Sequence, residues 1–129
     1  MKKEITGSFK WFITVGTNPG YDSSCSRSMP EEEFVACVRS VADQVQAETG
    51  VYVTSLAYQA KAVYKADWGC PESGEPVYVL TGVYNPEFSE IEKFRRSLIR
   101  YTEELKKKLS QTTVTLEIVP AELYYFRGE

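Results

Sequence analysis

The clearest chemical feature of the sequence is a pair of arginines four residues apart, Arg96 and Arg100. They lie in residues 93–108, where seven basic side chains face only two acidic ones, in a chain whose net charge is −3. On a helix, side chains four positions apart are neighbours on one face. Two adjacent guanidinium groups can hold a phosphate or pyrophosphate through paired hydrogen bonds. The pair therefore predicts a site for a small anionic ligand, to which Arg27 could contribute from an upstream loop.

The same basic segment also fits a solvated helix face held by ion pairs. Three acidic residues each precede a basic residue by four positions: Glu92–Arg96, Glu103–Lys107 and Glu104–Lys108. This spacing stabilises helices through side-chain ion pairs. The basic residues at the end of the segment also suit the negative end of a helix dipole. The sequence leaves both interpretations open.

Aromatic side chains are abundant, with two Trp, nine Tyr and six Phe. Five tyrosines lie at even-numbered positions in the two extended stretches: Tyr52, Tyr58 and Tyr64 in the first, and Tyr78 and Tyr84 in the second. Residues of one parity share one face of a strand. Such a face could stack a nucleobase, pack against a second copy of the chain, or form the core. Because a large exposed aromatic face promotes association, we expect a homodimer or a higher homo-oligomer.

Several kinds of chemistry are excluded by what the sequence lacks. There is no histidine, which rules out Ser-His-Asp and Cys-His catalysis and histidine metal sites. The three cysteines, Cys25, Cys37 and Cys70, match neither a disulfide framework nor a zinc pattern. No Walker loop or G-x-G-x-x-G motif occurs, so we expect no cofactor and no metal. The acidic balance, with a pI near 5.1, disfavours generic nucleic-acid binding.

The sequence also gives no sign of a membrane partner. No stretch approaches 18 consecutive apolar residues. The first residues, Met1–Glu4, lead into a strand-like pattern without the apolar core of a signal peptide. We therefore expect a cytoplasmic protein.

Hydrophobic periodicity predicts the order strand, helix, strand, strand, helix, strand. Alternation indicates strands over residues 5–15, 51–66, 77–84 and 112–119, and the length of 51–66 suggests a bend or bulge. Pro120 interrupts the last strand, and residues 123–126 form either a short fifth strand or a tail. Capping boxes at 28–31 and 89–92 predict helices that end near Gly50 and Leu109.

This order predicts one domain over residues 1–129 with an α+β fold. We expect a ferredoxin-like two-layer sandwich, in which two helices cover one face of an antiparallel sheet. The layout resembles small ferredoxin-like proteins of bacteria and phages.

A second resemblance concerns function. The dipeptide Tyr84-Asn85 and the Arg-x-x-x-Arg pair are similar to the pocket residues of phage anti-defence sponges. This resemblance implies an oligomer that sequesters cyclic ADP-ribose signals of the Thoeris system without turnover, in the host cytoplasm. We accordingly expect a non-catalytic protein that binds a small anionic, nucleotide-like ligand at an oligomer interface. The expected site residues are Trp68, Tyr84, Asn85, Arg96, Arg100 and Arg27.

Two other classes of protein remain open. One is a protein-interaction or inhibitor module that uses the aromatic face of the sheet. The other is a small dimeric α+β barrel enzyme with Asp or Tyr as general acid or base. The missing histidine and the combination of aromatic and basic residues favour binding over catalysis.

Overall fold

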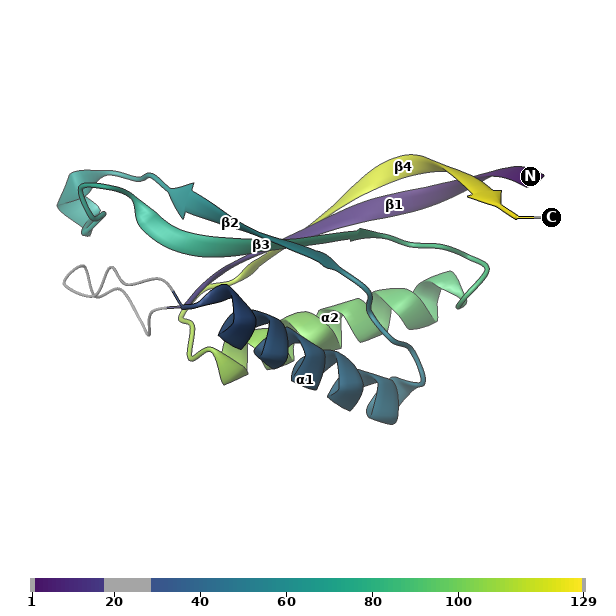
Figure 1. Cartoon of the computed structure of the whole chain (residues 1–129), viewed down its shortest axis with the longest axis horizontal. Helices are drawn as coiled ribbons and strands as arrows, with labels where there is room; N and C mark the ends of the chain where they lie inside the picture. The colour runs from purple at the N-terminus through teal and green to yellow at the C-terminus, as the bar shows by residue number, and fades with distance from the viewer. Residues whose placement is uncertain (1, 18–28, 129) are drawn as a thin grey trace.

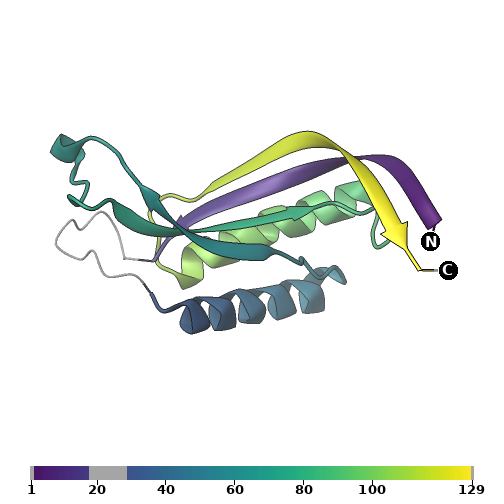
Figure 2. The ribbon, with the colours of Figure 1, turned by 45° about the horizontal axis from the view of Figure 1, so that its top comes forward.

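A computed structural model describes residues 2–17 and 29–128 of the chain. Four antiparallel strands form one sheet in the order β2-β3-β1-β4. The strands are β1 (Lys2–Gly16), β2 (Leu56–Ala62), β3 (Glu75–Val83) and β4 (Thr115–Arg127). Helices α1 (Glu31–Thr49) and α2 (Ile91–Lys108) cover the same face of the sheet (Figures 1 and 2). The ferredoxin-like two-layer prediction is confirmed.

Two strand predictions were wrong in their limits. Residues 51–55 lie outside the sheet, so β2 needs no bulge to reach its length of seven residues. Conversely, β4 runs unbroken through Pro120 and pairs with β1 along its whole length. Because β4 is an edge strand, the missing N–H of a proline is tolerated there. The β1–β4 ribbon extends beyond the helices, and its two chain ends lie side by side (Figure 1).

The helix boundaries show which capping signals operate. Gly50 ends α1 with a φ of 82°, a left-handed conformation that glycine adopts without strain. At the start of α2 the capping residue is Glu90, one position after the serine of the expected box. Its carboxylate accepts hydrogen bonds of 3.0 Å from the amides of Glu92 and Lys93, which lowers the pKa of Glu90. The expected box at 28–31 begins outside the described residues.

The core lies between the sheet and the helices, and Trp11 is at its centre. This side chain is fully buried and meets the Tyr101 ring edge to face, with centroids 6.2 Å apart. Its indole lies against Gly82, where an added Cβ would come within 2.6 Å of a ring carbon and 2.9 Å of the Thr54 carbonyl oxygen. The close approach of Trp11 to the β3 backbone therefore requires glycine at position 82.

The expected tyrosine face is divided between core and surface. Tyr78 is buried and stacks on Phe34 at 3.9 Å, and Tyr84 is buried and stacks on Phe9 at 5.3 Å. Tyr52 and Tyr58 are instead 43% and 48% exposed. The core interpretation is thus right for two of these tyrosines, and the others remain available to a ligand or partner.

The face of the sheet away from the helices, called here the open face, carries exposed or half-buried apolar side chains. The strand register places these five on it: Phe12, Leu56, Tyr58, Val83 and Val119. Leu56 is the most exposed of them, at 71%. None of the described helices is long and apolar enough to span a membrane.

Candidate functional site

A tyrosine and a glutamate meet at the loop end of the β2–β3 hairpin. The Tyr64 hydroxyl donates a hydrogen bond of 2.6 Å to Glu75 Oε1. Glu75 is the first residue of β3, and its register partner Ala62 is the last residue of β2. Tyr64 follows two positions later, and its amide donates to Cys70 Sγ at 3.5 Å within the hairpin loop. Both side chains are half-buried, so the loop holds a carboxylate and a phenol together where solvent reaches them.

Glu75 lines a small cavity of about 200 Å³, called here the polar cavity. It lies where the end of β1, the start of β3 and the turn from α2 to β4 meet. Gly16 and Gln111 line it together with four threonines: Thr14, Thr112, Thr113 and Thr115. No basic residue is among its described lining residues. Hydroxyl, amide and carboxylate oxygens around a small space suit a cationic ligand and disfavour an anion.

A second cavity of about 410 Å³ lies where the end of α1 meets the β3–α2 connection, and is called here the neutral cavity. Tyr52, Asn85 and Phe88 are among its lining residues, and none of the described residues lining it is charged. Asn85 Oδ1 accepts a hydrogen bond of 2.9 Å from the Glu87 amide, which shapes the turn before α2. Without a charged group, this cavity can offer stacking and neutral hydrogen bonds only.

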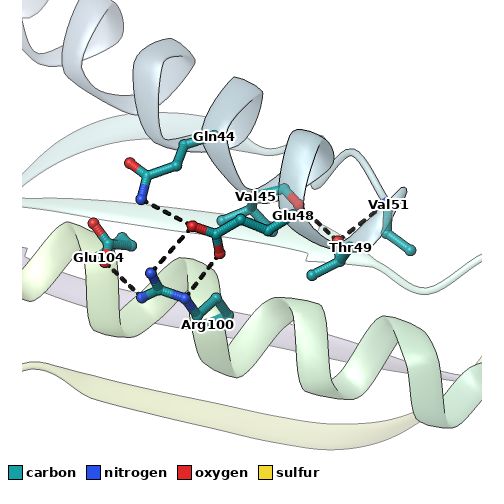
Figure 3. Close-up of polar contacts among 7 residues, drawn as sticks. All are labelled: Gln44, Val45, Glu48, Thr49, Val51, Arg100 and Glu104. Atoms are coloured by element: carbon teal, nitrogen blue, oxygen red, sulfur yellow. Dashed lines mark hydrogen bonds and ion pairs between the residues drawn. The ribbon is translucent and has the colours of Figure 1, made fainter.

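Arg100 is part of an ion-pair network that joins the two helices (Figure 3). Its guanidinium donates to Glu48 on α1 at 3.0 and 3.3 Å. It also lies 2.5 Å from Glu104 Oε1, one turn further along α2. These hydrogen bonds, first with Glu104 and then with Glu48, raise the pKa of Arg100. Arg100 therefore already holds two carboxylates in the place where a phosphate was expected.

The expected site residues are not gathered in one place. Tyr84 is in the core and Asn85 lines the neutral cavity. Trp68, 71% exposed, lies in the short helix η1 (Ala66–Trp68) of the β2–β3 hairpin loop. This loop lies at one end of the fold, and the end of α1 and the β3–α2 connection, whose residues line the neutral cavity, lie at the other (Figure 1). Arg96 is exposed on α2, and Arg27 lies outside the described residues.

The sequence interpretation did not single out Glu75 or Gln111. It named Tyr64 only as one of five tyrosines expected on the same face of the sheet. The missing information was the hairpin register, which brings residues 62 and 75 together across a twelve-residue loop. A signal was nevertheless present, because two strands joined by one loop must bring the end of the first beside the start of the second.

Replacing Arg100 with alanine is expected to lower the melting temperature by several degrees. The loss removes the ion pair with Glu48 on α1 and leaves the Glu104 carboxylate, whose side chain is only 10% exposed, without its cationic partner. Arg96→Ala, an exposed change on the same helix, is the matched control and should leave the melting temperature nearly unchanged. Thermal unfolding by circular dichroism compares them, and equal effects would contradict a structural role for Arg100.

The Glu104–Arg100 pair also predicts a dependence of stability on pH. The hydrogen bond from Arg100 lowers the pKa of Glu104 below its ordinary 4.5, against the opposing effect of burial. A carboxyl whose pKa is lower in the folded state stabilises the fold above its ordinary pKa and loses that contribution as pH falls through the folded value. Melting temperatures measured from pH 7 down to pH 3 should therefore fall less steeply for Glu104→Gln than for the wild type. Parallel curves would contradict the prediction.

The family described as SAM lyase matches residues 6–127 of the chain. Among solved structures, a phage SAM lyase in the apo state is similar at a TM-score of 0.59 and 16% identity, over 94% of this chain and 90% of that one. A phage SAM lyase in complex with S-methyl-5'-thioadenosine is similar at a TM-score of 0.57 and 16% identity, over 93% and 90%. No curated protein matches the sequence.

Proposed function

The chain belongs to the SAM lyase family, and from this we propose that it is an enzyme that cleaves S-adenosylmethionine, abbreviated SAM. The observation that carries the proposal is the family match over residues 6–127. The polar cavity supports it, because SAM carries a sulfonium and an ammonium group and the cavity offers a carboxylate with neutral oxygens. The thioadenosine in the similar phage enzyme supports the position of the cut, since it is SAM without its aminocarboxypropyl group.

Two predictions from the sequence are therefore wrong. The chain is not a sponge for cyclic ADP-ribose, and the expectation of a protein without catalysis fails, because the family to which it belongs is enzymatic. The missing histidine indicated only that no histidine could activate a nucleophile. SAM needs no such activation, because its sulfonium is already a good leaving group.

A lyase acting on SAM breaks a carbon–sulfur bond without adding water. In the reaction we propose, the carboxylate of the substrate attacks its own γ-carbon, and this ring closure gives a five-membered lactone. The electron pair of the broken bond goes to sulfur and leaves neutral S-methyl-5'-thioadenosine. Atoms and charge balance, and no proton moves. The enzyme then has to fold the substrate into a reactive conformation, which is catalysis by positioning.

Glu75 is the residue we assign to holding the substrate. A carboxylate beside the sulfonium would stabilise the substrate more than the transition state, because the sulfonium loses its charge as the bond breaks. The ammonium group keeps its charge throughout. Glu75 therefore contributes best by binding the ammonium, with Tyr64 holding one of its oxygens in place.

A second copy of the chain is part of the proposal. At about 200 Å³ the polar cavity is smaller than the roughly 300–1,000 Å³ of typical ligand pockets, so it fits only part of SAM. The exposed apolar residues of the open face, such as Leu56 and Tyr58, support association between copies. Trp68, on the same hairpin as Glu75, remains our candidate for stacking the adenine ring.

The biological setting is also a proposal. The similar structures are phage enzymes, which supports a phage protein that acts against host defence in the host cytoplasm. Destroying SAM would remove the methyl donor on which host methyltransferases depend.

The test is to incubate the purified protein with SAM and follow S-methyl-5'-thioadenosine by liquid chromatography and mass spectrometry. S-adenosylhomocysteine is the control, because its neutral thioether is a much poorer leaving group. We expect the thioadenosine from SAM and no product from the control. Intact SAM recovered after denaturing the protein would contradict the proposal and would indicate binding alone.

A further inference from the structure

The neutral cavity takes no part in the proposed reaction, yet it has the size of a ligand site. Its volume of about 410 Å³ is within the roughly 300–1,000 Å³ of pockets that enclose small molecules. Its walls come from the end of α1 and the β3–α2 connection, at the end of the fold away from the β2–β3 hairpin loop (Figure 1). A molecule bound here would be separate from the polar cavity.

Two aromatic side chains at the neutral cavity are exposed to solvent. Tyr52, just after α1, is 43% exposed, and Phe88, in the β3–α2 connection, is 74% exposed. The Phe88 amide donates a hydrogen bond of 3.1 Å to the Asn85 carbonyl oxygen, so the turn that carries its ring is held by its own backbone. Aromatic rings exposed on an ordered backbone offer surfaces on which a planar heterocycle can stack.

Asn85 adds a hydrogen-bonding edge to the neutral cavity. Its Oδ1 accepts a hydrogen bond of 2.9 Å from the Glu87 amide, which orients the side-chain amide. A carbonyl oxygen has two lone pairs, so Oδ1 can accept once more, and Nδ2 has no partner among the described residues. An amide that offers both a donor and an acceptor matches adenine, whose N6 donates and whose N7 accepts.

The charges around the neutral cavity disfavour an anionic ligand. Gly50 lines the cavity at the C-terminal end of α1, where the helix dipole is negative. Lys93 Nζ would lie 3.6 Å from a Cβ on Gly50, so this cation already faces the negative helix end. At the start of α2, the Glu90 carboxylate accepts from the amides of Glu92 and Lys93. A phosphate would therefore meet a negative helix end and a carboxylate, whereas an uncharged molecule meets neither cost.

We propose that the neutral cavity is a second ligand site that binds an uncharged adenine nucleoside, with the adenine edge on Asn85 and the ring beside Tyr52 and Phe88. The proposal goes beyond SAM cleavage and does not depend on it. S-methyl-5'-thioadenosine belongs to this class of ligand, and SAM does not, because SAM is charged. The site therefore distinguishes the product of the proposed reaction from its substrate.

The two tryptophans provide one spectroscopic reporter for each cavity. The Trp11 indole N–H is buried and has no partner among the described residues. The adjacent ring carbon Cε2 and the carbonyl oxygen of Thr54, a lining residue, come within 2.8 and 2.9 Å of the point where a Gly82 Cβ would stand. Trp68 lies in the hairpin loop. With adenosine as the probe, we expect ¹H–¹⁵N correlation spectra to show shifts of the Trp11 indole and Asn85 amide signals. Shifts confined to Trp68 and the hairpin loop, or none at millimolar adenosine, would overturn the proposal.

Asn85→Asp tests the assigned contact with adenine. It keeps the oxygen that accepts from the Glu87 amide, so the turn should remain, and it removes the Nδ2 donor. The Kd for adenosine, obtained from the same titration, should rise about 10-fold or more, and inosine, which has an acceptor in place of the N6 donor, should bind the wild type about 10-fold more weakly than adenosine. Gln111→Glu makes the same chemical change at the polar cavity and should leave the Kd within about twofold.

An unchanged Kd in Asn85→Asp would contradict the assigned contact. None of these measurements requires turnover, so the proposal and the proposed function fail separately. If adenosine does not bind at the neutral cavity, SAM cleavage still stands. If the wild type does not cleave SAM, the shifts of the Trp11 and Asn85 signals still establish the second site.

Discussion

Glu75→Gln is expected to lower kcat/KM for SAM by about 100-fold or more, the scale of removing one partner of a close, hydrogen-bonded charge pair. The substitution keeps the shape of the side chain and an oxygen that can accept from the Tyr64 hydroxyl, so the hairpin end should remain in place. It removes only the negative charge that we assign to the ammonium of the substrate. Initial rates of thioadenosine formation over a range of SAM concentrations give the measurement.

Glu72→Gln is the control for this experiment. Glu72 is exposed in the same hairpin loop and does not line the polar cavity. Its loss changes the net charge by the same amount and should leave kcat/KM within about twofold, as expected for an exposed charge. If both variants kept wild-type activity, Glu75 would have no part in binding the substrate.

Trp11→Ala should reduce the free energy of unfolding by about 3–5 kcal/mol, the usual range for deleting a large buried aromatic side chain. Trp11 is fully buried between Tyr101 and Gly82, so its removal leaves a cavity that the β3 backbone cannot fill. Urea unfolding followed by far-ultraviolet circular dichroism measures the change.

Trp68→Ala makes the same chemical change at the other tryptophan, which is 71% exposed. Its unfolding curve should match that of the wild type, while KM for SAM should rise if Trp68 stacks the adenine ring. Equal destabilisation of the two variants would contradict the described core. An unchanged KM for SAM in Trp68→Ala would show that Trp68 does not bind the substrate.

Local patterns predicted much of the fold. Alternation over residues 5–15 correctly predicted the strand β1, and its apolar side chains Phe9, Trp11, Ile13 and Val15 are buried. The end of α1 at Gly50 followed from the need for a residue that tolerates positive φ. The continuity of β4 through Pro120 could not be predicted, because it depends on the strand lying at the edge of the sheet.

The site was harder to predict because its geometry depends on contacts distant in sequence. Spacing of four residues suggested partners for the basic helix, but Arg100 pairs with Glu104 and, on the other helix, with Glu48. No local rule contains that second contact. The contact between Tyr64 and Glu75 likewise required the hairpin register. The proposed chemistry has no signature among catalytic side chains, because in it the reactivity lies in the sulfonium of the substrate.

The most direct test of the account is to identify the first products from SAM in ¹⁸O-labelled water. Reactions are quenched early and both fragments are analysed by mass spectrometry. We predict S-methyl-5'-thioadenosine together with a lactone that contains no ¹⁸O, because the ring oxygen comes from the substrate's own carboxylate. Unchanged SAM would contradict the proposed enzyme. Homoserine carrying ¹⁸O in its hydroxyl group as the first product would show that water attacks and that the enzyme is not a lyase.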